Sequence, residues 1–254
     1  MKYLILIFDA PLMSFGAVIV DHYGPTDRFP GQAMLTGLLG NALGWRHGDA
    51  VALQALQDRI VFAARWDLPP VPMRDYHTVD LGQSKMTGYA TAADKGAPGG
   101  WTTRGSPEHR TGEARFGTYQ REMNYWANGI MTVSLGLTGD GDPSVNDLAQ
   151  ALRTPARPLF IGRKTCIPAT PILREIKEAP DVLSALRMVP RERRPGIGPK
   201  PAPDMEACWP DHLHLSSAPK AHRVVTVYDR RDWRAQTMVG RRVRCEGLIT
   251  EEPR

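Results

Sequence analysis

The sequence predicts a mixed α+β fold, and two observations support this. Short apolar runs, continuous or alternating, recur along the chain, and between them lie segments whose apolar residues repeat with helical spacing. Aspartate, proline and glycine bound the runs, as is typical of strand ends. With 254 residues, 42% of them hydrophobic and 23% charged, the chain is long enough for one large domain or two small ones.

The first part of the chain supplies a strand, two helices and a second strand. Residues 2–9 form a continuous apolar run, which predicts a buried strand. Apolar residues at helical spacing predict a helix over residues 33–44, where Gly44 suits a C-terminal cap. A short helix at 49–56 then leads into an apolar strand at 60–66.

The same order of elements returns further along the chain. Residues 129–137 alternate in the manner of a strand, and Ser144 with Asp147 forms a capping box that opens the next helix. A strand with a basic centre follows at residues 158–167. The resulting order, βαββαβ, predicts a ferredoxin-like core of the kind also found in RNA-recognition-motif domains. Because many functions share this fold, the order alone does not assign one.

An insertion at residues 67–128 separates the second and third core strands, where a plain ferredoxin-like domain has a tight hairpin. It begins and ends with strand-like segments, at 73–79 and 114–126, which predict a long hairpin-like arm. The residues between them are rich in Gly, Thr and Ala, punctuated by arginines and aromatic residues. Two interpretations remain open, a disordered surface loop and an arm that becomes ordered on a partner.

The C-terminal part has a weaker pattern. A short helix is predicted at 181–188, an irregular Pro/Arg-rich loop at 190–220, and a closing pair of strands at 222–229 and 238–249. We therefore expect two domains: residues 1–168, the ferredoxin-like domain with its insertion, and residues 169–254, a C-terminal extension.

Several classes of protein are disfavoured by composition. Three cysteines, far apart and odd in number, argue against a disulfide framework and for a reducing cytoplasm. The apolar run at 3–8 is too short for a signal peptide, and no segment approaches the ~20 apolar residues of a membrane span. His212 and His214 are a weak metal signal, and two side chains on one strand face explain them better. No nucleotide, cofactor or standard catalytic motif is present, so we expect no metal and no cofactor.

The formal charge of +5 permits a nucleic-acid partner without requiring one. Within the stretch MRDYHTV (73–79), strand alternation places Arg74 and Tyr76 on one face and Asp75 and His77 on the other. A Tyr–His acid–base pair would need both groups to converge on one phosphate, and neighbours on a regular strand diverge. Arg74 with Tyr76 instead suits phosphate contact plus base stacking on single-stranded RNA. A solvated hairpin base is the alternative.

Other basic positions are weaker candidates. Gly162 beside Arg163 and Lys164 would let backbone and charges approach a phosphate together, although a solvated strand end fits as well. Arg28 precedes a helix N-terminus, which favours anions, but a single surface arginine usually carries no function. Two further basic runs are predicted to be solvated faces: RERR at 191–194 and GRRVR at 240–244.

Four blocks, taken together and in this order, resemble the CasD family of type I-E CRISPR Cascade subunits, which are repeat-associated RNA-binding proteins with a ferredoxin-like core. The resemblance is good over residues 1–168 and loose over 169–254. The blocks are YLILIFDAPLMSFG, GPTDRFPGQAMLTGLLGNALG, MRDYHTV and PLFIGRKTCIPATP.

The resemblance implies a non-catalytic subunit that caps the 5′ handle of the CRISPR RNA and has no cofactor. Implied partners are a CasC-type backbone subunit, a CasA-type large subunit and, indirectly, target DNA, with no membrane. The insertion corresponds to the family's thumb. The residues expected at RNA are Arg28, Arg74, Tyr76, His77, Arg104, Arg115, Tyr119, Arg121, Arg163 and Lys164.

Two other functions remain open. In a metal-independent endoribonuclease, Tyr76 or His77 would assist attack by a 2′-hydroxyl on CRISPR repeat RNA. In a module that binds only protein, the arginines would merely keep the surface soluble.

Overall fold

A computed structural model describes residues 1–19, 23–80, 118–194, 204–211 and 221–251. The fold is mixed α+β and dominated by sheet, with two compact units. The first unit comprises residues 1–18, 26–73 and 125–254, and the second comprises residues 19–25 and 74–124. Among the described residues, no helix is long and apolar enough to span a bilayer.

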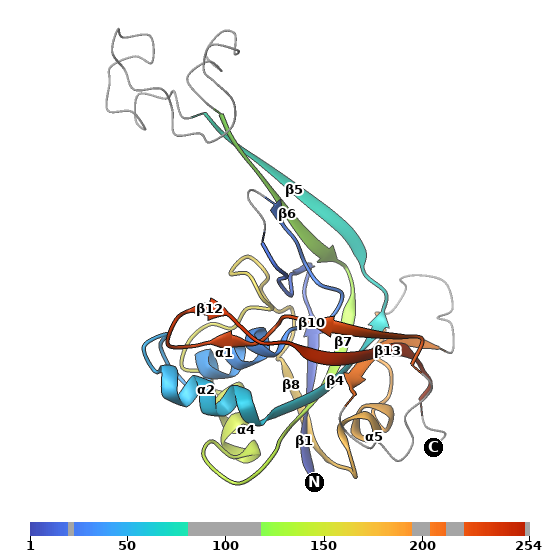
Figure 1. Cartoon of the computed structure of the whole chain (residues 1–254). Coiled ribbons are helices and arrows are strands. Elements are labelled where there is room, and N and C mark those ends of the chain that lie inside the picture. Colours follow the sequence, from blue (N-terminus) through green and yellow to red (C-terminus); the bar gives the residue numbers. More distant parts are fainter. Residues whose placement is uncertain (20–22, 81–117, 195–203, 212–220, 252–254) are drawn as a thin grey trace, which may run out of the picture. The chain divides into compact units, whose positions relative to one another are not determined.

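A seven-stranded sheet forms the centre of the first unit within the described residues (Figure 1). Neighbouring strands run antiparallel, and the three adjacent strands β4, β7 and β1 are buried along almost their whole length, so the core lies along them. In spatial order the strands are β10 (Arg223–Val227), β13 (Arg242–Ile249), β9 (Met205–Pro210), β4 (Ile60–Leu68), β7 (Ile130–Leu137), β1 (Lys2–Asp9) and β8 (Leu173–Glu178).

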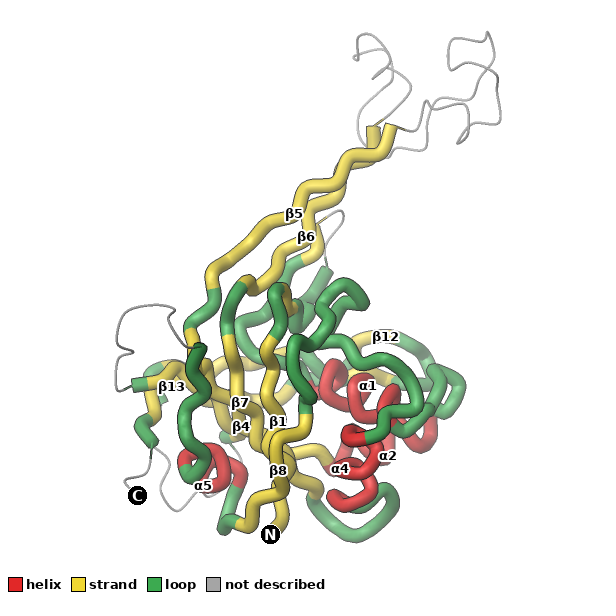
Figure 2. The backbone as a smooth tube through the Cα atoms, turned by 180° about the vertical axis from the view of Figure 1, so that it is seen from behind, coloured by secondary structure: helices red, strands yellow, loops and turns green. Residues whose placement is uncertain are grey.

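Helices pack on both sides of this sheet (Figure 2). On one side α5 (Val182–Arg187) packs on β4 and β7. On the other lie α1 (Gln32–Ala42), α2 (Ala50–Arg59) and α4 (Val145–Arg153), of which α4 contacts β1 and β8. Side chains on both faces of β1 and β7 are buried, so neither face of these two strands is open to a ligand within the described part of the chain.

Most predicted elements are confirmed. The strand at 2–9, the helices at 33–44 and 49–56 and the strands at 60–66 and 129–137 all form, with ends shifted by a few residues. The capping box is also present, since the Ser144 hydroxyl accepts from the Asp147 N–H and the Asp147 carboxylate accepts from the Ser144 N–H at 2.8 Å. The pair expected near the C-terminus is β10 with β13.

The strand predicted at 158–167 is wrong. The Ile161 N–H donates to the Cys166 carbonyl at 2.8 Å, which closes a turn, and Gly162 has φ +94°. A strand cannot include this left-handed conformation without interruption. The strand that follows α4 in the sequence is instead β8, which pairs with β1.

The predicted irregular loop at 190–220 contains β9, which lies between β13 and β4. Strands from the predicted extension therefore share one sheet with strands from the predicted first domain, and the domain boundary at residue 168 stays a prediction.

Two smaller sheets complete the described structure. The strands β11 (Arg231–Asp232) and β12 (Thr237–Met238) pair with each other. In the other sheet β5 (Val71–Asp80) pairs with β6 (Thr118–Ala127). Short strands also pair with β6: β2 (Leu12–Met13) antiparallel at residues 126–127, and β3 (Tyr23–Gly24) parallel at residues 122–123.

Candidate nucleic-acid interface

The second unit presents two tyrosines and an arginine on one face. Arg74 lies 3.5 Å from Glu122 as an exposed ion pair, which places both side chains on the same side of β5 and β6. Glu122 is also the register partner of Tyr23 on β3. Tyr76 follows Arg74 by two residues and therefore shares its side. We call Tyr23, Arg74, Tyr76 and Glu122 the tyrosine face.

This face is well exposed for residues of its kind. The Arg74 side chain is 67% exposed, Tyr76 53% and Tyr23 47%. Exposed aromatic rings on neighbouring strands, with a cation beside them, can stack on unpaired bases and contact the linking phosphates. Tyr23 was not predicted. It lies on a strand of only two residues, for which no periodic pattern exists in the sequence.

His77 lies on the opposite face. Its Nε2 is 2.6 Å from the Asp75 carboxylate, as the predicted alternation requires. On a regular strand, the Tyr76 hydroxyl and the His77 imidazole therefore cannot both reach one RNA phosphate. The described geometry brings Arg74 and Tyr76 together and separates them from His77.

The remaining candidates of the insertion divide between described and undescribed parts. Arg121 is exposed and, by alternation from Glu122, lies on the His77 side of the hairpin. Arg104 and Arg115 lie outside the described residues, as does the side chain of Tyr119.

Arg163 and Lys164 lie in the first unit, in the turn at 161–166. The Arg163 guanidinium lies 4.8 Å from the centre of the Tyr125 ring, and Lys164 is exposed. Gly162 has a packing role, because a Cβ there would lie 1.5 Å from the Ser14 carbonyl oxygen. The glycine thus lets the turn approach the backbone at Ser14. We had instead predicted that it would let the backbone approach a phosphate.

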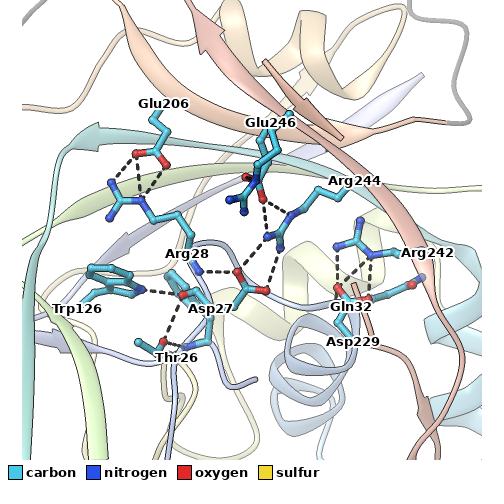
Figure 3. Close-up of polar contacts among 12 residues, drawn as sticks. Thr26, Asp27, Arg28, Gln32, Trp126, Glu206, Asp229, Arg242, Arg244 and Glu246 are labelled. Atoms are coloured by element: carbon cyan, nitrogen blue, oxygen red, sulfur yellow. Dashed lines mark hydrogen bonds and ion pairs between the residues drawn. The ribbon is translucent and has the colours of Figure 1, made fainter. Parts of the chain in front are cut away.

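Arg28 is already engaged inside the first unit (Figure 3). Its Nε lies 2.9 Å from one Glu206 oxygen and its Nη2 2.5 Å from the other. The guanidinium also lies 5.1 Å from the Trp66 ring centre and 4.8 Å from that of Trp126. Its charge is matched and its faces are stacked, so an RNA phosphate would have to compete with Glu206.

The N-terminus of α1 has an anion of its own. The Asp229 carboxylate accepts from the Gln32 N–H at 3.0 Å and pairs with the Arg242 guanidinium at 2.6 Å (Figure 3). This carboxylate occupies the position at which we expected a phosphate to be favoured.

The GRRVR run is not the solvated face that we predicted. Arg244 is 1% exposed, donates to Asp27 at 3.0 Å and to Glu246 at 2.6 Å, and lies over the Phe29 ring. Arg242 pairs with Asp229 as described above, whereas Arg241 is exposed. Two long-range ion pairs, Arg28–Glu206 and Arg244–Asp27, thus join β9 and β13 to the segment before α1.

Neither a metal cluster nor a reactive thiol stands out among the described residues. No group of three or more His, Cys, Asp or Glu residues there could hold a metal ion, and His212 and His214 fall outside the described part. Burial raises the pKa of the Cys208 thiol to about 12 and that of Cys245 to about 11, where Asp211 adds to the effect.

Comparison with known proteins completes the description. The family model described as CRISPR-associated protein (Cas_Cas5) matches residues 3–245. The chain is 29% identical over 193 residues to "CRISPR system Cascade subunit CasD" of Escherichia coli (strain K12), which covers 73% of this chain and 75% of the relative.

Two solved structures are similar in fold over 98% of this chain. A chain of "CRISPR RNA-guided surveillance complex" has a TM-score of 0.65 and 19% identity, with 90% of it covered. A chain of "Crystal structure of Cas protein" has a TM-score of 0.59 and 20% identity, with 95% covered.

Proposed function

Because the chain belongs to the CRISPR-associated Cas5 family, we propose that it is a non-catalytic RNA-binding and assembly subunit of a type I-E CRISPR surveillance complex. In this role it caps the 5′ handle of the guide RNA and contacts a CasC-type backbone subunit and a CasA-type large subunit. Target DNA is reached only through the assembly. The site of action is the cytoplasm, in antiviral defence.

The observation that carries this proposal is the tyrosine face. Arg74, Tyr76 and Tyr23 combine an exposed cation with two exposed rings, which is the combination that binds single-stranded nucleic acid through phosphate contact and stacking. The usual alternative in such folds is the face of the central sheet. Helices of the first unit pack here against β1, β4, β7 and β8 of that sheet, so the hairpin is the better-suited surface.

We also propose that the core is ferredoxin-like and that the hairpin is its thumb. The spatial order β4-β7-β1-β8 and the sequence order β1, α1, β4, β7, α4, β8 support a βαββαβ core. In the sequence β5 and β6 lie between β4 and β7, the two strands that a plain core would join by a tight turn.

The turn at 161–166 offers a second contact, which gives a direct test. Replacing Arg163 and Lys164 together by alanine removes two cations from a turn whose close approach to Ser14 depends on Gly162, and it also removes the contact of Arg163 with the Tyr125 ring. We expect weaker binding of handle-bearing RNA, with a salt slope reduced by about one to two units in a filter-binding titration. An unchanged slope would remove this pair from the interface.

Incubating the purified chain with CRISPR repeat RNA in EDTA separates the proposal from the endoribonuclease hypothesis. We expect no cleavage, because Tyr76 and His77 lie on opposite faces of β5. Cleavage that is lost in His77→Ala would overturn the proposal. A native assembly that contains no nucleic acid would instead indicate a module that binds only protein.

A further inference from the structure

The basic run at 191–194 holds the root of the hairpin. We predicted a solvated face for this run, yet three of its four residues contact the two points where the hairpin joins the core. One of these points is Asp67, near the end of β4, and the other is Asn128, between β6 and β7. Both belong to the first unit, as does the run itself. We call Arg191, Glu192 and Arg194 the root clamp.

The outgoing end is held at Asp67. Its buried carboxylate accepts from the Glu192 N–H at 2.9 Å, and its backbone carbonyl accepts from the Arg191 Nε at 2.5 Å. The same carboxylate also accepts from the Thr132 hydroxyl at 2.6 Å and from the Arg65 Nε at 2.7 Å. Every one of these bonds involves a charged group, the class that contributes most per bond.

The returning end is held at Asn128. Arg194 donates to the Asn128 carbonyl at 3.2 Å and pairs through its other terminal nitrogen with the Asp9 carboxylate. The Asn128 N–H in turn donates to the Pro11 carbonyl at 3.2 Å. One side chain of the clamp therefore joins the end of β1 to the point where the chain leaves β6.

The clamp is itself fixed to the core. Arg65 donates to the carbonyls of Leu186 and Val189, each at 2.7 Å, which holds the end of α5 just before the run. The Glu192 carboxylate pairs with Arg174 on β8. Because the clamp is bonded to β1 and β8 as well as to both ends of the hairpin, it has little freedom to move apart from them.

We propose that Arg191, Glu192 and Arg194 are positioning residues for RNA capture by the hairpin, although none of them is among the residues expected to contact RNA. This inference rests on the proposed function. Hinge motions concentrate at a few residues where elements end, and the root at 67–70 and 127–129 is such a place. By bonding to both sides of that root, the clamp restricts motion of the root itself and so lowers the ordering cost of RNA binding by the hairpin.

The test compares Arg194→Ala with Arg193→Ala in the full chain. Both variants lose one positive charge from the same run, but Arg193 is exposed whereas Arg194 bridges Asp9 and Asn128. Amide hydrogen exchange is measured at Leu68 and Val71, at residues 125–128, and in β1 and β7. RNA affinity is measured with a single-stranded RNA that carries the repeat-derived handle. We expect Arg194→Ala to speed root exchange about tenfold and to weaken binding about threefold to tenfold. Arg193→Ala changes neither.

Hydrogen exchange tests the clamp, and RNA affinity tests the proposed function, so the two hypotheses can fail separately. Unchanged root exchange in Arg194→Ala overturns the clamp, and so does exchange that rises equally in β1 and β7, because that marks a general loss of stability. Faster root exchange in a protein whose wild type binds no RNA supports the clamp and overturns the proposed function. If Arg194→Ala does not fold, Arg194→Lys keeps the ion pair with Asp9 and loses the bridge, and an intermediate effect is then expected.

Discussion

The arginines of the central sheet and those of the hairpin have opposite surroundings. In the first unit Arg65 and Arg244 are almost fully buried, and each donates to at least two acceptors. In the second unit Arg74 is 67% exposed and pairs with Glu122 at 3.5 Å, and Arg121 is exposed as well. The same side chain therefore supports the fold in one region and is available to a ligand in the other.

The physical reason is desolvation. Removing a guanidinium from water costs several kcal/mol, so a buried arginine persists only where carboxylates and carbonyls fill its donor positions. Such a group is out of reach of a phosphate, and most of its nitrogen atoms already donate to acceptors inside the protein. An exposed arginine keeps its hydration and exchanges it for a phosphate at little cost. Net charge thus says little about where RNA binds, and the number of internal partners says much more.

The largest test of this comparison is Asp67→Ala. The change leaves Arg65 buried beside the carbonyls of α5 without its carboxylate, and it removes the acceptor of Thr132 and of the Glu192 N–H. We expect a loss of about 3–5 kcal/mol in the free energy of unfolding, measured by urea denaturation. Asp75→Ala on the hairpin also removes a carboxylate, but this one is exposed and pairs with His77. We expect it to change the free energy of unfolding by less than about 0.5 kcal/mol. Equal losses in the two variants would contradict the comparison.

Arg244→Met tests the same idea at a partly exposed network. Methionine fills a similar volume over Phe29 but leaves Asp27 and Glu246 without their shared cation. Because Asp27 remains 30% exposed and can be hydrated, we expect a smaller loss of about 2 kcal/mol. Arg241→Met, three residues away and exposed, is the matched control and should be neutral in the same urea titration.

Local patterns in the sequence predicted most of the helices and strands, because these depend on periodicity over a few residues. The run at 158–167 shows the limit. Ile161 and Cys166 are buried as expected, but they are buried by a turn that Gly162 fits against Ser14. An apolar run records that residues are buried and does not record the backbone path that buries them.

The candidate site was less predictable, because its determinants are pairings over long distances. The partner of Arg28 is Glu206, 178 residues away, and that of Arg244 is Asp27, 217 residues away. No local rule distinguishes these arginines from Arg74. Strand alternation correctly separated Arg74 and Tyr76 from His77. Tyr23 joins Arg74 and Tyr76 only through the pairing register of β3 with β6, which the sequence does not reveal.

Alkaline pH should lower the free energy of unfolding, because the buried thiol of Cys208 resists ionisation in the folded state. Burial raises the pKa of its thiol to about 12 in the folded state, above the ordinary value near 8.5. The unfolded chain therefore loses this proton first, and the stabilisation present below pH ~8.5 is lost as the pH rises toward 12. Because of this thiol, we expect the free energy of unfolding to fall by about 2 kcal/mol between pH 8 and pH 10. Cys208→Ala should reduce the pH dependence of urea unfolding by that amount, and an unchanged pH dependence would contradict the assignment.

Tyr76→Ala carries the comparison to the hairpin, where side chains should matter for binding and not for folding. Removing the exposed ring eliminates one stacking contact, so we expect a loss of about 1–2 kcal/mol in the free energy of binding handle-bearing RNA, measured by fluorescence anisotropy. The urea midpoint should stay unchanged, because the ring is 53% exposed and buries little area. Tyr76→Phe keeps the ring and should bind almost as well as the wild type, since stacking needs the π face and not the hydroxyl. A phenylalanine variant as weak as the alanine variant would show that the hydroxyl, through a hydrogen bond, makes the contact, and the stacking role of this face would then be wrong.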